Sequence, residues 1–144
     1  MLRKPLLLSF FLSSAALGQT FDTGNNAALK GDYFVREVLI TAENTSGTIT
    51  SAASAMGVAT FNGAGSYKFS DVSGKTATGS YGAATNGLLY VQSFVDSTQK
   101  AFGGLAAIGP SAFVASATEG SSADLIVAIP AGTTANAASL TGSR

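Results

Sequence analysis

The chain of 144 residues contains no cysteine and no histidine, and only three prolines. Without cysteine and histidine it lacks the commonest general bases, metal ligands and thiol nucleophiles of enzymes. Disulfide bonds are excluded as well, so burial of a core must hold the fold together. The composition therefore predicts that the protein is not an enzyme and that it has no catalytic, cofactor-binding or metal-binding residues.

Charge is scarce and balanced, with eight basic and eight acidic residues that together make up 11% of the chain. Nucleic-acid binding relies on clustered lysine and arginine that displace counterions from phosphates. The sequence offers no such cluster, so we expect no nucleic-acid partner. Two kinds of partner stay open, namely other cell-surface modules and a small apolar ligand.

The N-terminus has the three parts of a secretory signal peptide at residues 1–18. Arg3 and Lys4 form a basic start, an apolar stretch interrupted only by serines follows at 6–17, and cleavage is expected after Gly18. The stretch is short for a helix that spans a bilayer, and no cysteine follows that could carry a lipid anchor. The sequence predicts an exported protein, secreted, periplasmic or at the cell surface, and the lack of disulfides favours a bacterial one.

The rest of the chain divides into a polar segment, one domain and a tail. Residues 19–28 are small and polar and are expected to be flexible. Residues 29–130 form the domain, and residues 131–144 follow as a C-terminal tail. Because Ser139 to Ser143 in the tail resembles Ala28 to Asp32, a second unit that starts in the tail stays open.

Within the domain, short β-type runs alternate with glycine, asparagine, aspartate and serine. Asn62-Gly63-Ala64-Gly65 and Asn86-Gly87 mark hairpin turns, because asparagine and glycine tolerate a positive φ. Between residues 66 and 70, Tyr67 and Phe69 alternate with polar residues, as in a strand with one buried face. Strands are expected at 33–41, 55–61, 66–70, 76–83, 88–95, 101–108, 112–118 and 124–129.

About eight short strands with short connections predict an all-β antiparallel meander, and no segment after residue 18 has a helical period. An up-and-down β-barrel is favoured because closure removes unpaired edges, and a β-sandwich is the alternative. The Ser- and Thr-rich stretch 44–54 is expected to be a connection. Gly103 and Gly104 are expected to form a bulge or a bend.

The spacing of these landmarks resembles a group of exported bacterial β-domain proteins of lipocalin-like or up-and-down barrel type. The resemblance rests on four motifs within residues 28–130, which are Leu29-x-Gly31-x-Tyr33-Phe34, Thr60-Phe61-Asn62-Gly63-Ala64-Gly65, Gly79-Ser80-Tyr81 and Asn86-Gly87-Leu88. These motifs are structural, so the resemblance implies a barrel and carries no particular activity.

Two patterns of acidic residues bear on catalysis. Asp22-Thr23-Gly24 matches the triplet of aspartic proteases, which use two carboxylates that share a proton. The sequence holds no second copy of the triplet, so we interpret it as a chance match. Two of the eight acidic residues, distant in sequence, could still meet in a barrel and act as a glycosidase pair.

The sequence thus favours a non-enzymatic structural or interaction module outside the cytoplasm. The first alternative is a lipocalin-like binder of a small apolar ligand, although plain core aromatics explain the same residues. Its candidate lining residues are Tyr33, Phe69, Tyr81, Tyr90, Phe94 and Phe113. The second alternative is a small outer-membrane barrel, for which strands of about nine to eleven residues are hard to find.

Overall fold

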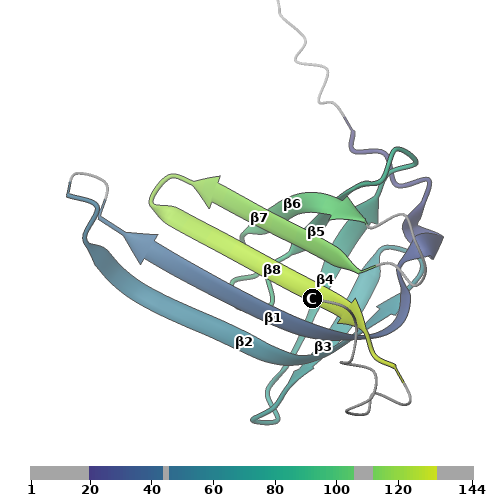
Figure 1. Ribbon diagram of the computed structural model, residues 1–144, viewed down its shortest axis with the longest axis horizontal. Helices are drawn as coiled ribbons and strands as arrows, with labels where there is room; N and C mark the ends of the chain where they lie inside the picture. The colour runs from purple at the N-terminus through teal and green to yellow at the C-terminus, as the bar shows by residue number, and fades with distance from the viewer. Residues whose placement is uncertain (1–19, 44–45, 106–111, 133–144) are drawn as a thin grey trace, which may run out of the picture.

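The structure is a computed structural model that describes residues 20–43, 46–105 and 112–132. The described chain begins with a short 3-10 helix, η1 (Asn26–Ala28). The strands that follow are β1 (Lys30–Ala42), β2 (Ile49–Asn62), β3 (Ser66–Asp71), β4 (Thr76–Ala83), β5 (Leu88–Gln92), β6 (Lys100–Leu105), β7 (Phe113–Glu119) and β8 (Ser122–Pro130) (Figure 1). The predicted signal peptide and the tail from residue 133 onwards lie outside the described residues.

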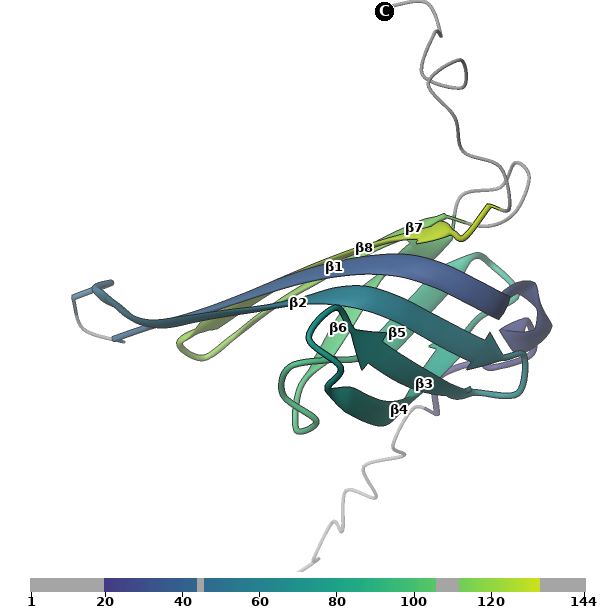
Figure 2. The ribbon, with the colours of Figure 1, turned by 90° about the horizontal axis from the view of Figure 1, so that it is seen from below.

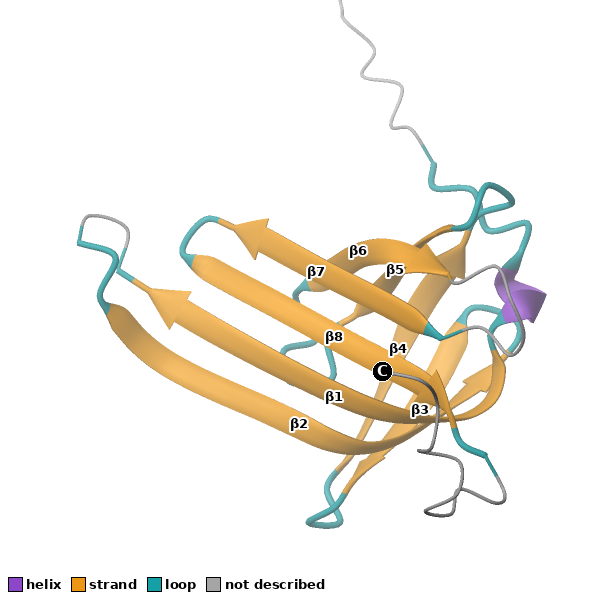
Figure 3. Ribbon diagram, in the orientation of Figure 1, coloured by secondary structure: helices purple, strands orange, loops and turns teal. Residues whose placement is uncertain are grey.

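The strands close into one antiparallel barrel. Each strand pairs with the next along the chain, and β8 pairs with β1 from Tyr33 opposite Pro130 to Thr41 opposite Ser122 (Figure 3). The predicted all-β meander and its up-and-down barrel are confirmed, and the sandwich is excluded. The predicted run 101–108 ends as a described strand at Leu105, and the rest of that run lies outside the described residues.

Alternation along the strands places one face of the sheet inside the barrel. On β1, Tyr33, Val35 and Leu39 are buried, whereas Phe34 and Arg36 between them are exposed. The same pattern recurs on β3 and β8. Burial of this inner face provides the hydrophobic stabilisation of a chain without disulfides.

Four strands continue beyond the barrel as an extension. Figure 2 shows β1 and β2, together with β7 and β8, reaching past the ends of the shorter strands. β3 pairs with β2 only at Gly57–Phe61, so Ile49–Ala55 pairs with β1 alone within the described residues. The prediction that 44–54 is a connection is therefore wrong for Ile49–Ser54. Both faces of this stretch are exposed to solvent, so neither face needs apolar side chains. The stretch therefore lacks the alternation of apolar and polar residues from which a strand is predicted.

The segment before the barrel, predicted to be flexible, contacts the barrel from Phe21 onwards. The Asp22 carboxylate accepts hydrogen bonds from the backbone N–H of Thr85 at 2.9 Å and from its hydroxyl at 2.7 Å. The ring of Phe21 meets Tyr90 edge-on, with 5.0 Å between centroids. These bonds hold the pKa of Asp22 below its usual range, and they give the Asp22-Thr23-Gly24 triplet a structural role.

The pair Gly103 and Gly104 does not form the expected bulge. β6 keeps a continuous register through both residues, opposite β5 on one side and β7 on the other. A Cβ atom at Gly103 would lie 1.9 Å from the carbonyl oxygen of Val114. Glycine is therefore needed at position 103 because the backbones of β6 and β7 approach closely.

We expect Gly103→Ala to lower the free energy of unfolding by about 2 kcal/mol or more, because its methyl group must displace β7. Gly104→Ala is the matched control, since a Cβ atom there would meet only the Gly87 carbonyl oxygen at 3.8 Å. Urea unfolding of both variants measures the difference. Equal losses in the two variants would contradict the close approach.

Candidate functional site

The barrel interior is filled by aromatic rings. Phe61 lies at the centre, with 5.1–5.9 Å between its ring centroid and those of Tyr33, Tyr67, Tyr81 and Phe113. All five side chains are buried. Because the rings contact one another edge-on or tilted, they pack as a core at the centre of the barrel.

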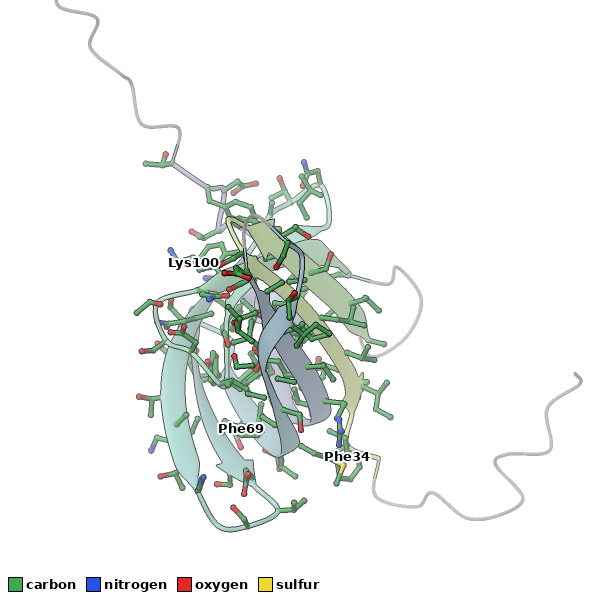
Figure 4. The ribbon with its side chains drawn as sticks, turned by 90° about the vertical axis from the view of Figure 1, so that its left-hand side faces the viewer. Phe34, Phe69 and Lys100 are labelled. Atoms are coloured by element: carbon green, nitrogen blue, oxygen red, sulfur yellow. The ribbon has the colours of Figure 1, made fainter. Side chains whose placement is uncertain are left out.

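The six aromatic residues predicted as a ligand lining do not line one cavity. Five of them are buried inside the barrel, namely Tyr33, Phe69, Tyr81, Phe94 and Phe113. Figure 4 shows Phe69 between the strands and Phe34 on the outside of the wall. Tyr90 is half-buried on the outer face, where the Lys100 ammonium group lies 4.9 Å from its ring centroid.

One end of the barrel is closed by the chain that leads into β1. Leu29, directly after η1, is completely buried. The Tyr81 hydroxyl donates hydrogen bonds to the carbonyl oxygens of Leu29 at 2.8 Å and Asn26 at 3.1 Å. This end is therefore fixed by both an apolar side chain and a buried hydroxyl.

The opposite end is closed by residues 93–99, which we call the plug loop. The sequence predicts a strand through Val95, but the chain leaves the sheet after Gln92. Phe94 then turns into the barrel, and its ring centroid lies 4.7 Å from that of Tyr67 and 4.9 Å from that of Phe69. The plug loop therefore contributes an aromatic side chain to the core.

Tyr67 supports the start of the plug loop. Its hydroxyl donates hydrogen bonds to the carbonyl oxygens of Gln92 at 2.9 Å and Ser93 at 3.2 Å. The ring lies over Gly79, where a Cβ atom would come within 2.3 Å of the hydroxyl oxygen. The missing side chain at Gly79 thus makes room for the ring that fixes the plug loop.

A buried carboxyl group on β1 binds the same part of the loop. Glu37 is completely buried on the inner face. The Ser93 hydroxyl donates to its Oε1, and the Phe94 N–H donates to its Oε2 at 2.7 Å. The Ser93 oxygen accepts in turn from the backbone N–H groups of Val95 and Asp96, at 3.1 and 2.9 Å. Glu37 therefore organises the first turn of the plug loop.

A second buried carboxyl group lies next to Glu37. Asp124 on β8 is only 4% exposed and faces the interior opposite Leu39, while Glu37 is opposite Ile126. This register places the two acidic side chains diagonally on adjacent strands, within reach of each other. No N–H or O–H group of the described residues donates to either Asp124 oxygen when both carboxyl groups are ionised. A protonated Glu37 can supply the missing donor.

The environment of the pair favours that proton. Burial, with the Asp124 charge as a further cause, raises the pKa of Glu37 from 4.5 to about 7. Burial raises the pKa of Asp124 as well. The two groups titrate as a coupled pair, and we assign the shared proton to Glu37, which donates to Asp124.

The glycosidase hypothesis requires two acidic side chains that are distant in sequence and close in space, and Glu37 and Asp124 meet this condition. Unlike the carboxyl groups of an open active site, however, they are not accessible to a substrate. Both carboxyl groups are buried, and the plug loop binds one of them directly. In the described residues, no three potential metal ligands among aspartate and glutamate gather at one place. Sequence reasoning did not single out these two residues. Alternation along β1 places Glu37 on the inner face with Val35 and Leu39, but only the register between β1 and β8 places Asp124 beside it.

The outer surface carries a second candidate site, which we call the outer apolar strip. Its six side chains are each 40–54% exposed and come from β1, β2, β7 and β8; they are Phe34, Met56, Val114, Leu125, Val127 and Ile129. Phe34 is opposite Ile129, and Val127 is opposite both Val114 and Arg36. A shallow groove runs along the strip between Phe34, Met56 and Val127.

Comparison with protein-family models, with curated proteins and with solved structures found no match for this chain. Among the residues that the structure describes, no helix is long and apolar enough to cross a lipid bilayer. The function must therefore be argued from the two sites themselves.

The buried pair makes the stability depend on pH, and we expect the free energy of unfolding to fall between pH 4.5 and 7. In this range the folded chain keeps a proton on Glu37 that the unfolded chain releases, so a rising pH favours unfolding. The shift from 4.5 to about 7 corresponds to about 3 kcal/mol. Urea unfolding at several pH values measures it.

Glu37→Gln is expected to remove most of this dependence. Glu43→Gln, at an exposed position just after β1, is the control and should keep it. The aspartates with lowered pKa values, at positions 22, 71 and 96, titrate below this range. A wild-type stability that rises steadily from pH 4.5 to 7 would be incompatible with a protonated Glu37.

Proposed function

We propose that this chain is a non-enzymatic interaction module that acts outside the cytoplasm and binds a protein partner through the outer face of β1, β2, β7 and β8. The observation that carries the proposal is the outer apolar strip. Contiguous apolar patches of this kind are uncommon on proteins that act alone, and they mark contact surfaces. The strip lies on the outside of the barrel, so these six side chains do not contribute to the core.

The free edge of β2, which lies next to the strip, is a second reason to place the contact site on this surface. Ile49–Ala55 pairs with β1 alone, so its outward N–H and C=O groups have no strand partner in the described residues. Such an edge can accept an extended peptide segment as an added strand. Met56 follows this edge directly and belongs to the strip. A partner that presents an extended segment with apolar side chains fits both features.

The polar side chains on the outer face of β3 favour a barrel that is surrounded by water over one in a membrane. On β3, the outward positions carry Ser66, Lys68 and Ser70, and all three are exposed. An outer-membrane barrel needs an apolar band around its whole circumference. The buried acidic pair, held under the plug loop, likewise favours binding over catalysis as the role of the chain.

Photo-crosslinking in the cells that export the protein tests the proposal. Benzoylphenylalanine in place of Val127 should give a discrete crosslinked product with a second protein, because this position lies in the strip. The same group in place of Lys68, on the polar outer face, should not give that product. Equal crosslinking from both positions would contradict a contact site on the strip.

The crosslinked protein, once purified, permits a quantitative test. Replacing Val127 and Ile129 together by serine is expected to weaken its binding about tenfold or more, because two partly buried apolar side chains are lost. Both positions are exposed, so the barrel should stay folded. Lys68→Ser is the control and should bind as the wild type does. An unchanged affinity in the double variant would refute the strip as the binding surface.

A further inference from the structure

We propose that the barrel end now filled by Phe94 is a binding site for a small aromatic or apolar ligand, and that ionisation of Glu37 together with Asp124 releases the plug loop and opens it. This inference does not depend on the outer apolar strip. The site lies inside the barrel, where a bound ligand would take the place of the Phe94 ring.

The position of Phe94 is the first reason. Its ring belongs to a loop, and it contacts Tyr67 and Phe69, which belong to the barrel wall. An open groove lies beside the ring, between the plug loop, the middle of β2, the end of β3 and the start of β4. Ala55 and Ala77 line this groove with small side chains. Withdrawal of Phe94 would therefore join the groove to a pocket with two aromatic walls.

The construction of the plug loop is the second reason. Its own hydrogen bonds hold it as one unit, because the Asp96 carboxylate accepts from the N–H and hydroxyl of Thr98 at 2.9 and 2.7 Å. The Gln99 N–H also donates to the Asp96 carbonyl oxygen at 3.0 Å. Three wall side chains bind the loop: Glu37 and Tyr67 bind its start, and the Gln92 amide donates to the Ser97 carbonyl oxygen. The loop can therefore move outward without losing its internal structure.

The charges around Glu37 are the third reason. β8 contributes Asp124, and β3 contributes the Tyr67 phenol. The Asp96 carboxylate of the plug loop is bonded to Thr98 instead. On the neighbouring strands, Ala55 and Ile126 stand opposite Glu37 and carry no charge. Asp71 and Lys75 line the outer part of the groove. In the described residues, the charged group that shifts the pKa of Glu37 is another acid.

Two ionised carboxyl groups are therefore costly while the loop is closed, and water relieves this cost once it opens. The pKa of Glu37 is about 7 in the closed barrel, against 4.5 for the same group in water. By linkage, the ratio of open to closed molecules rises with pH, by at most about tenfold per pH unit, wherever the closed barrel keeps a proton on Glu37 that the open barrel releases. The bonds from Ser93 and Phe94 favour the ionised carboxylate and partly offset this rise. A ligand that binds only the open form shifts the ratio further.

The chemistry of the vacated space defines the ligand class. Tyr67 and Phe69 offer ring faces and edges, and the alanines leave room for a group about the size of the Phe94 ring. Aromatic rings bind other rings and apolar groups in offset or edge-on geometry. A small ligand with one aromatic or apolar group fits this site.

Binding of N-phenyl-1-naphthylamine, a neutral apolar fluorescent probe, tests the proposal on the full chain. For the wild type we expect its affinity to rise at least about tenfold from pH 5 to pH 8, because the closed form predominates at low pH. Glu37→Gln should show no such rise, and the exposed control Glu43→Gln should behave as the wild type. Binding to the outer apolar strip would not change with pH, so it does not imitate the effect.

Two further measurements test the proposal even if the Glu37→Gln variant does not fold. Asp124→Asn should show a smaller rise than the wild type, because an ionised Glu37 then has no neighbouring negative charge. In the wild type, the Phe94 amide should exchange with solvent at least about tenfold faster at pH 8 than at pH 5 after correction for intrinsic exchange. The amides of β4 should not follow this increase.

The proposal is overturned if the wild type binds the probe equally at both pH values, or if Glu37→Gln keeps the rise. It is also overturned if the Phe94 amide shows no acceleration beyond that of β4. These outcomes leave the outer apolar strip untouched, since crosslinking at Val127 reports on the other face of the wall.

Discussion

The barrel end that the plug loop closes depends on the hydrogen bonds that the Glu37 carboxyl group accepts from Ser93 and Phe94. Through Ser93 these bonds define the first turn of the plug loop, and through Phe94 they place a ring against Tyr67 and Phe69. The same carboxyl group lies beside Asp124, and no cationic side chain of residues 20–43, 46–105 and 112–132 is buried with them. One residue therefore both fastens the loop and makes that fastening sensitive to protons.

The filled interior explains why the two proposed binding sites lie where they do. Aromatic rings occupy the centre of the barrel, so a ligand can enter only where a movable side chain gives way. Larger partners must use the outside, where β1, β2, β7 and β8 expose apolar side chains on the outer face of the barrel wall. The short strands β3 and β4 complete the barrel and leave the edge of β2 free.

Much of the fold follows from local sequence patterns. Asn62 and Gly63 mark a turn that the structure confirms, and β4 spans 76–83 as predicted, because turn residues and alternation act over a few positions. The prediction that Ile49–Ser54 is a connection failed. This stretch is a strand because it pairs with the far half of β1, which local sequence does not reveal. Phe94 was predicted to lie at the end of a strand, whereas it lies on a loop whose position depends on Glu37, 57 residues earlier. Neither carboxyl group of the buried pair was identified, because long-range register alone brings them together.

The carbon-13 chemical shift of the Glu37 side-chain carboxyl group, followed by NMR through a pH titration of the folded protein, tests the central claim most directly. A buried carboxyl group that shares a proton with Asp124 should titrate with an apparent pKa of about 7. A Glu37 that titrates near 4.5 while the barrel stays folded and Phe94 stays buried would contradict it.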